Sequence, residues 1–145
     1  MGQLRYEAAL AHAQGYIALR ASTDWGAVSL QTAHSALAGS LGGISAYEDG
    51  ELIGMARYIG DGVLNIYIQD VIIAPHKRRQ SIGTELISRL IAHLQANYPH
   101  GCTIGLMATR EQDGFYVPFG FIPRPSDVYG AGMIASLGDL RALSG

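Results

Sequence analysis

The sequence predicts a single α/β (α+β) domain in which helices flank a mixed, mostly antiparallel central sheet. Two Asp-Gly pairs, at 49–50 and 61–62, separate short apolar segments, and such turns are typical of hairpins between antiparallel strands. A long amphipathic segment then separates two further apolar segments, and a strand–helix–strand succession places its two strands parallel in one sheet. The chain of 145 residues is 48% hydrophobic and 15% charged, which suits one globular domain over residues 1–145.

The strands are expected at 15–21, 44–48, 52–59, 63–74, 103–108, near 121 and at 132–135. They form a sheet of six to seven strands in which 63–74 and 103–108 are the parallel pair. Pro75 ends the strand 63–74 because proline has no backbone N–H to donate.

Helices are expected in three parts of the chain. Apolar residues between Ala27 and Leu41 indicate one or two helices, which Gly42-Gly43 ends. Segment 82–97 carries its apolar residues on one helical face; they are Ile82, Leu86, Ile87, Leu90, Ile91 and Leu94. A short helix is expected from about 111 to 118.

Composition and charge exclude several classes of protein. The net charge of −2 argues against nucleic acid as the main partner, because no strong positive field surrounds the fold. No run approaches the roughly 18 to 20 apolar residues that cross a bilayer, and residues 1–13 lack the pattern of a secretory signal. Cys102 is the single cysteine, so we expect a reducing, cytoplasmic location. The five histidines show no ligand spacing, and no metal is expected.

The junction between strand 63–74 and helix 82–97 has features of an anion site. A helix N-terminus offers unpaired backbone N–H groups and a partial positive charge, which suit a phosphate. Small residues at Ser81 and Gly83 let a ligand approach the backbone, and the basic run 77–79 adds charge. The alternative is an ordinary strand-to-helix turn with a solvated basic run.

Two motifs in this part of the chain resemble those of the GCN5-related N-acetyltransferases (GNAT superfamily). Ile73-Ala74-Pro75 followed by Arg78-x-x-Ser81-x-Gly83 resembles the family's coenzyme A loop, Arg/Gln-x-x-Gly-x-Gly/Ala. Residues 115–121, Phe-Tyr-Val-Pro-Phe-Gly-Phe, resemble its second hallmark, Phe-Tyr-x-x-x-Gly-Phe. The resemblance is close over residues 52–121, and it implies a GNAT-like fold, acetyl-CoA as co-substrate and transfer of an acetyl group to an amine.

The resemblance also implies where the coenzyme binds. The pyrophosphate would lie on the backbone N–H groups of residues 79–84, and the pantetheine arm would pair along strand 63–74 as an added strand. The two parallel strands would splay apart to admit it, and an N–H near Val71 would polarise the thioester carbonyl. The implied coenzyme-binding residues are Val71, Ile72, Ile73, Arg78, Arg79, Gln80, Ser81, Ile82, Gly83 and Thr84.

Ser81 departs from the family pattern, which has glycine at this position. If the position needs a positive φ, serine costs about 1 kcal/mol. If it needs only a small side chain, the serine hydroxyl instead caps the helix.

Two residues are candidates for proton transfer. Tyr116 resembles the general acid of the family: a neutral tyrosine, with a pKa near 10, still holds its proton at neutral pH and donates it to the departing thiolate. The alternative role is a core aromatic between Phe115 and Phe119. Asp70 is the first candidate for the general base, because a carboxylate interrupts an apolar strand there. The alternatives are a pair with an arginine such as Arg57, or a base reached through water near Tyr67 or Glu111.

Trp25, Tyr58 and Tyr129 are candidates for an aromatic acceptor site, with core packing as the alternative. They favour a small-molecule amine as acceptor, acetylated directly in a ternary complex, without nucleic acid or membrane partners; a homodimer is compatible with the sequence. The alternative function is a catalytically weak acetyl-CoA sensor or regulatory protein.

Overall fold

The computed structural model describes residues 2–143 and divides into two compact units, Met1–Leu106 and Met107–Gly145. The first unit holds a five-stranded sheet in the order β1-β2-β3-β4-β5, with β4 and β5 parallel and the other pairs antiparallel. Its elements are β1 (Leu4–Glu7), α1 (Ala13–Arg20), α2 (Leu30–Ala38), β2 (Gly42–Glu48), β3 (Glu51–Gly60), β4 (Asn65–Ile73), α3 (Ile82–Asn97) and β5 (Thr103–Leu106), with a 3-10 turn at Pro75–Lys77.

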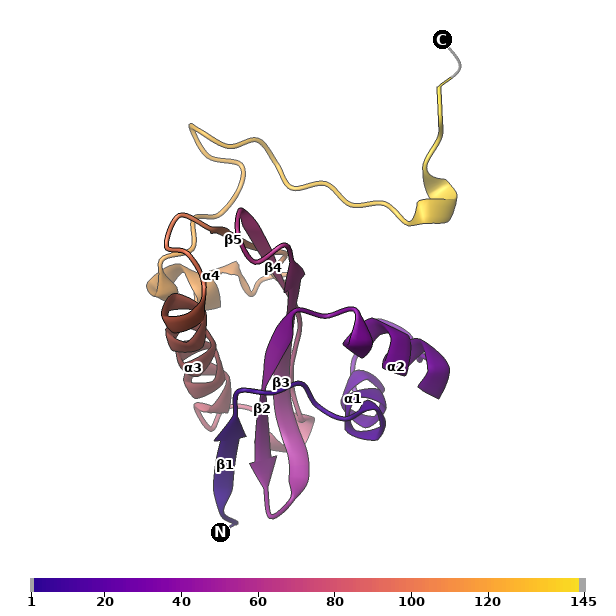
Figure 1. Cartoon of the computed structure of the whole chain (residues 1–145), viewed down its shortest axis with the longest axis vertical. Coiled ribbons are helices and arrows are strands. Elements are labelled where there is room, and N and C mark those ends of the chain that lie inside the picture. The colour runs from indigo at the N-terminus through magenta and orange to yellow at the C-terminus, as the bar shows by residue number, and fades with distance from the viewer. Residues whose placement is uncertain (1, 144–145) are drawn as a thin grey trace. The chain divides into compact units, whose positions relative to one another are not determined.

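Helices cover both faces of this sheet. Figure 1 shows α1 and α2 on one side of β2 and β3 and α3 on the other. The face of α3 predicted to be apolar is the one that packs inward, and Ile82, Leu86, Ile87, Leu90 and Leu94 are buried. The parallel β4–β5 pair, the helix between them and the Asp49-Gly50 turn, with both residues at positive φ, confirm the predicted architecture.

The N-terminal region differs from the prediction. Residues 15–21 were expected as a strand, but 13–20 form α1, because the His12 side chain accepts the Gly15 N–H at the helix start and Ala13, Tyr16 and Leu19 fall on one buried face. Strand β1, which pairs with β2, was not predicted.

The end of one helix and the form of one turn also differ from the prediction. Helix α2 ends at Ala38, with Gly39 as its C-cap, and not at Gly42-Gly43. These two glycines lie in β2, where the Tyr58 side chain and the Ala56 carbonyl leave no room for a Cβ. Asp61-Gly62 is not a two-residue turn, because the Asp61 carboxylate accepts the N–H groups of residues 63, 64 and 65 and closes a longer loop.

The second unit contains α4 (Asp113–Tyr116) and 3-10 turns at Val117–Phe119 and Leu137–Asp139. The first two confirm the short helix predicted at 111–118. The strands predicted near Phe121 and at 132–135 do not form, so the sheet has five strands in the described residues rather than six to seven. Prolines at 123 and 125 remove two backbone donors, and Met133 and Ile134 are 88% and 86% exposed, so neither contributes a buried face to a strand.

Candidate active site

The loop between β4 and α3 contains two residues in the left-handed conformation. Arg79 has φ 65° and Ser81 has φ 64°, and α3 begins at the next residue, Ile82. Ser81 is the N-cap residue, but its hydroxyl accepts no hydrogen bond from the N–H groups of the first helical turn. The loop therefore offers an exposed, electropositive helix start of the kind that binds phosphate.

Of the two explanations for Ser81, the structure supports the first: the position needs a positive φ, and serine does not cap the helix. Ser81 is the residue at which the family pattern has glycine. A left-handed residue with a Cβ costs about 1–2 kcal/mol, so serine is tolerated here rather than preferred.

Replacing Ser81 by glycine is expected to stabilise the protein. Glycine removes the Cβ strain, and its greater freedom in the unfolded chain offsets part of this, leaving a gain of about 0.5–1 kcal/mol and about 2 °C in Tm. Thermal unfolding measures the change. Ser81→Val is the matched control, because a β-branched side chain at this φ should lower Tm by several degrees; an unchanged Tm in both variants would contradict the assignment.

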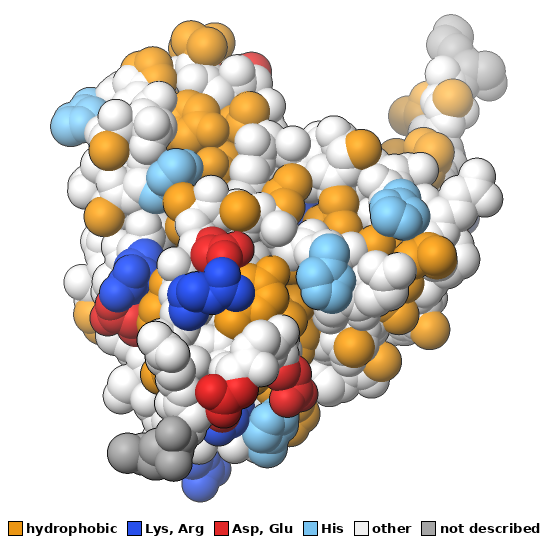
Figure 2. Space-filling model, turned by 60° about the horizontal axis from the view of Figure 1, so that its bottom comes forward, with side chains coloured by type: hydrophobic (Ala, Val, Ile, Leu, Met, Phe, Trp, Pro, Cys, Tyr) orange, Lys and Arg blue, Asp and Glu red, His pale blue; other side chains and the backbone are white. Residues whose placement is uncertain are grey.

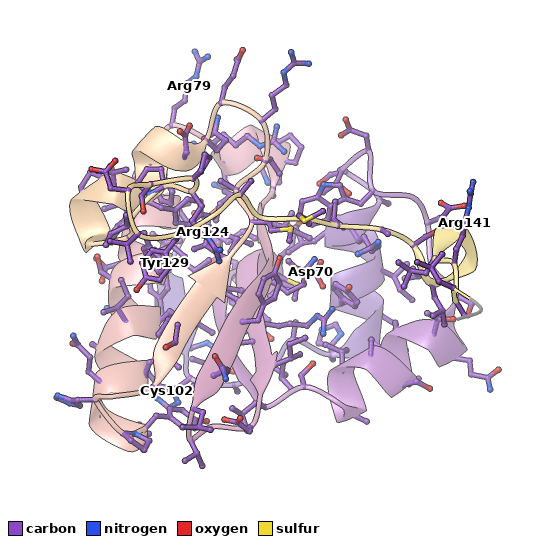
Figure 3. All side chains as sticks on the ribbon, turned by 90° about the horizontal axis from the view of Figure 1, so that it is seen from above. Asp70, Arg79, Cys102, Arg124, Tyr129 and Arg141 are labelled. Carbon is purple, nitrogen blue, oxygen red and sulfur yellow. The ribbon has the colours of Figure 1, made fainter. Side chains whose placement is uncertain are left out.

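The basic run beside this loop is not all available to a ligand. Lys77 pairs with Glu48 of β2, which offsets its charge. The Arg78 Nε lies 3.4 Å from the Ile73 carbonyl, and Arg79 points outward from the fold (Figure 3). Arg78 and Arg79 are thus the cations beside the α3 N-terminus that a ligand can reach.

Strand β4 has an edge that β5 does not cover. The parallel ladder runs from the Asn65–Thr103 pair to the Ile68–Leu106 pair, and β4 then continues to Ile73. The register with β3 also shifts in this part, because Met55 pairs with Ile72 while Arg57 pairs with Gln69. Such a β-bulge bends a strand and increases its local twist.

Asp70 occupies the bulge with φ 55°, and its side chain is fully buried. Its carboxylate accepts hydrogen bonds from the Tyr16 hydroxyl at 2.6 Å and from Arg57 Nε at 2.6 Å. Arg20 and Gln69 donate more distantly, at 3.3 and 3.4 Å. The pair with Arg57, offered above as the alternative role for Asp70, is present. A buried carboxylate is stable only with such partners.

Tyr16 and Arg20 were missed by sequence reasoning, because residues 15–21 were expected as a strand. The signal that finds them is their i, i+4 spacing, which puts both on one face of a helix. Burial, followed by the hydrogen bond to Asp70, raises the pKa of the Tyr16 hydroxyl, which keeps it a donor. Figure 3 shows Asp70 between the strands and the two N-terminal helices.

Tyr116 belongs to an aromatic cluster in the second unit. Its ring meets Phe115 edge-on at 4.9 Å and Phe121 at 6.0 Å, and Phe115 in turn meets Phe119 at 5.6 Å between centroids. The ring is only partly covered, and burial raises the pKa of its hydroxyl. Tyr116 therefore holds its proton through the neutral and mildly alkaline range.

The three aromatic residues predicted for an acceptor site have different surroundings. Tyr58 is 1% exposed and shares a 3.2 Å hydrogen bond with the Tyr98 hydroxyl, so it packs in the core. Trp25 is 37% exposed with the Arg20 guanidinium 5.8 Å from its ring centre. Tyr129, 50% exposed, lies under Arg124 in the second unit.

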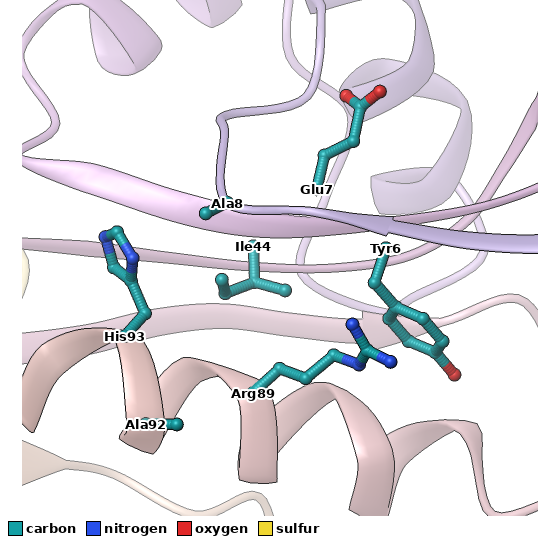
Figure 4. Close-up of a pocket in the computed structure, with 7 residues that line it drawn as sticks. All are labelled: Tyr6, Glu7, Ala8, Ile44, Arg89, Ala92 and His93. Carbon is teal, nitrogen blue, oxygen red and sulfur yellow. The ribbon is translucent and has the colours of Figure 1, made fainter. Parts of the chain in front are cut away.

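A separate hollow of about 230 Å³ lies between the start of the sheet and α3 (Figure 4). Arg89 and His93 enter it from α3, and the Arg89 guanidinium stacks on the Tyr6 ring at 4.5 Å. None of the residues predicted for the coenzyme or the acceptor line it.

Two features are absent from residues 2–143. Across that range, no three His, Cys, Asp or Glu side chains gather as a metal-binding group. Within it, no helix combines the length and apolar character that crossing a membrane requires.

The β4–β5 ladder thus ends before the bulge at Asp70, and β4 is followed by a helix start that suits a phosphate, in a mixed α/β fold. Residues 15–135 match the family model described as the acetyltransferase (GNAT) domain. The chain therefore belongs to the GNAT superfamily of acetyltransferases.

Relatives and solved structures agree with this membership. The chain is 36% identical over 78 residues to GCN5-related N-acetyltransferase 1, chloroplastic, of Arabidopsis thaliana, and 32% identical over 81 residues to serotonin N-acetyltransferase 2, chloroplastic, of rice. These alignments cover 54% and 56% of the chain but only 39% and 40% of the two relatives. A Staphylococcus aureus protein described as a probable acetyltransferase of unknown function superposes with a TM-score of 0.81 and 25% identity, covering 92% of this chain and 99% of that one.

Proposed function

We propose that this protein is an acetyl-CoA-dependent N-acetyltransferase that acetylates a small-molecule primary amine by direct transfer in a ternary complex. One observation carries the proposal: the end of β4, beyond its pairing with β5, leads into the left-handed loop at the start of α3. An extended arm needs free strand edge, and a pyrophosphate needs free N–H groups, and these two features are consecutive in the chain.

The residues present fit coenzyme A. The N–H groups of residues 79–84 would hold the pyrophosphate, with Arg78 and Arg79 as nearby cations. The segment Val71, Ile72 and Ile73 would pair with the pantetheine arm, and the N–H near Val71 would stabilise negative charge on the thioester oxygen. Acetyl-CoA supplies the acetyl group as a thioester.

Tyr116 is proposed as the general acid that protonates the departing thiolate. Its raised pKa supports this role, because the hydroxyl stays protonated wherever the enzyme works near neutrality. The general base remains a prediction for Asp70. The four donors around its carboxylate leave little room for an incoming amine. This favours the alternative in which the amine proton leaves through water molecules, and Asp70 then has the structural role of holding the bulge in place.

The acceptor is proposed to be a small amine with an aromatic or apolar body. The relative from rice is named for serotonin, an arylalkylamine, and Trp25 offers an exposed ring in this chain. On the face drawn in Figure 2, basic and acidic side chains lie beside one another rather than in one basic patch. Together with the net charge of −2, this supports an acceptor other than nucleic acid. A cytoplasmic location and a homodimer stay predictions.

Acetyl-CoA binding is tested by thermal unfolding. At 100 times its Kd the coenzyme stabilises a folded protein by about 2.7 kcal/mol, which corresponds to about 8 °C for a chain of this size. NAD is the control ligand and should give no shift. A shift with NAD but none with acetyl-CoA would contradict the proposal.

Turnover separates the enzyme from a coenzyme sensor. Release of free thiol is measured against a panel of arylalkylamines including serotonin, polyamines and aminosugars. An acetyl-CoA shift without thiol release for any amine would favour the sensor.

A further inference from the structure

The Arg20 side chain connects three separate parts of the first unit. Its Nε donates to the Gly26 carbonyl at 3.1 Å, and its NH2 donates to the Trp25 carbonyl at 3.2 Å. Its NH1 donates to Asp70 Oδ1 at 3.3 Å and to the Tyr16 hydroxyl at 3.3 Å. One guanidinium thus binds α1, the loop 21–29 between α1 and α2, and the bulge of β4.

This geometry depends on arginine. A guanidinium carries five N–H donors in a fixed planar fork, so it can hold two carbonyls and a carboxylate at once. A lysine ammonium keeps the charge beside Asp70, but its three donors share one nitrogen and cannot span groups that arginine reaches from three separate nitrogens. The arginine side chain is 18% exposed. Its bonds to Asp70 and Tyr16 are part-buried, whereas its bonds to the Trp25 and Gly26 carbonyls lie at the surface.

Loop 21–29 is held to β4 through Arg20. Thr23 and Ser22 bond back to the last turn of α1, whereas the Trp25 and Gly26 carbonyls accept from the Arg20 guanidinium. The Trp25 ring is partly exposed beside that guanidinium. Because the same guanidinium donates to Asp70, a hydrogen-bonded path runs from the loop through Arg20 to the bulge.

We infer that Arg20 is a positioning residue: it fixes the Trp25 loop relative to the end of β4 and thereby sets how tightly the acceptor binds. Asp70 precedes Val71, which is proposed to face the thioester, so Arg20 joins the loop that carries the exposed indole to the strand that would carry the acetyl group. This role rests on the proposed function. In this role, Asp70 is the residue of β4 to which Arg20 holds the Trp25 loop.

The test compares Arg20→Lys with Arg57→Lys. Both variants keep a cation beside Asp70, but the Arg57 side chain donates to Asp70 and Ser40 rather than to the loop. Trp25 is the single tryptophan, so its fluorescence reports the loop directly, and chymotrypsin cleaves after it. In Arg20→Lys we expect cleavage at Trp25–Gly26 to be about tenfold faster and acrylamide quenching to rise, with neither change in Arg57→Lys.

Kinetics then separate positioning from general loss of structure. With an amine from the panel that gives thiol release, Arg20→Lys should raise the acceptor KM about tenfold while kcat and the acetyl-CoA thermal shift stay near wild type. A loop as protected in Arg20→Lys as in wild type would overturn the inference, whatever the activity. A released loop with an unchanged acceptor KM would overturn the role in acceptor binding.

Gly26→Ala provides a second route that leaves Arg20 and Asp70 intact. Gly26 has φ 90°, and a methyl group on its Cα would meet no other atom within 4 Å, so alanine strains the loop backbone without a clash. It should raise the acceptor KM as Arg20→Lys does, and an unchanged KM would count against the loop. No thermal shift with acetyl-CoA in the wild type would instead refute the proposed function. Cleavage at Trp25 would still test whether Arg20 holds the loop to β4.

Discussion

Asp70→Ala is expected to lower the free energy of unfolding by about 3–5 kcal/mol, because it leaves the buried Arg57 and Arg20 cations without their counter-charge. The Asp70 side chain is fully buried, and those of Arg57 and Arg20 are only 14% and 18% exposed, so water cannot replace the lost carboxylate well. Urea unfolding followed by circular dichroism measures the change. A loss of this size is a large share of the stability of a typical domain.

The matched control is Glu85→Ala. Glu85 also pairs with an arginine, Arg89, at 2.7 Å, but both side chains are about half exposed. An exposed pair of this kind contributes a few tenths of a kcal/mol, so the control should unfold almost as the wild type does. Equal unfolding energies for the two variants would contradict a structural role for the Asp70 cluster.

Asp70→Asn separates the structural role from the predicted proton transfer. Asparagine keeps an oxygen for the Tyr16 hydroxyl and the shape of the site, but it cannot take a proton from an amine. If Asp70 is the general base, the folded variant loses acetyl transfer while retaining the acetyl-CoA thermal shift. Retained transfer removes Asp70 from the proton path.

Tyr116→Phe is expected to lower the rate of acetyl transfer by about 10²- to 10⁴-fold, the usual contribution of a positioned general acid. Phenylalanine keeps the edge-on packing against Phe115 and Phe121, so the fold and the acetyl-CoA thermal shift should stay. Thiol release at saturating substrates measures the rate. Tyr47→Phe, at a buried tyrosine of β2, is the control and should retain the rate.

The pH dependence gives a second check on Tyr116. Burial raises the pKa of its hydroxyl, and an acid must be protonated to act, so its activity is lost only as the pH rises above the ordinary tyrosine value of about 10. The deficit of Tyr116→Phe should therefore be constant from about pH 7 to 9. A deficit that vanishes within this range would contradict the assignment.

Local patterns were sufficient for the centre of the chain. The apolar stripe of 82–97 has the period of a helix, and a helix between two apolar strands places them parallel, as β4 and β5 are. The Asp49-Gly50 turn was equally predictable, because few residue pairs accept positive φ at both positions. The candidate coenzyme loop, which stays a prediction, was also identifiable because its residues are consecutive in the chain.

Contacts between distant residues were not predictable in the same way. Helix α1 was taken for a strand because Tyr16 and Ile17 favour strands locally, whereas burial of Tyr16 and Leu19 against the sheet selects the helix. The pairing of Asp70 with Tyr16 joins residues 54 positions apart, and only the packing of α1 on β4 brings them together.

The sequence by itself thus determined the GNAT class, and it yielded a candidate coenzyme loop and Tyr116 as a candidate acid, because each depends on neighbours in the chain. Tertiary structure decided the conformation of Ser81, where φ 64° shows strain rather than capping. It also decided the surroundings of Asp70: a candidate base in the sequence is, in the fold, a carboxylate held by two arginines and a tyrosine. The physical reason is that a charge can be buried only where partners from several elements converge on it.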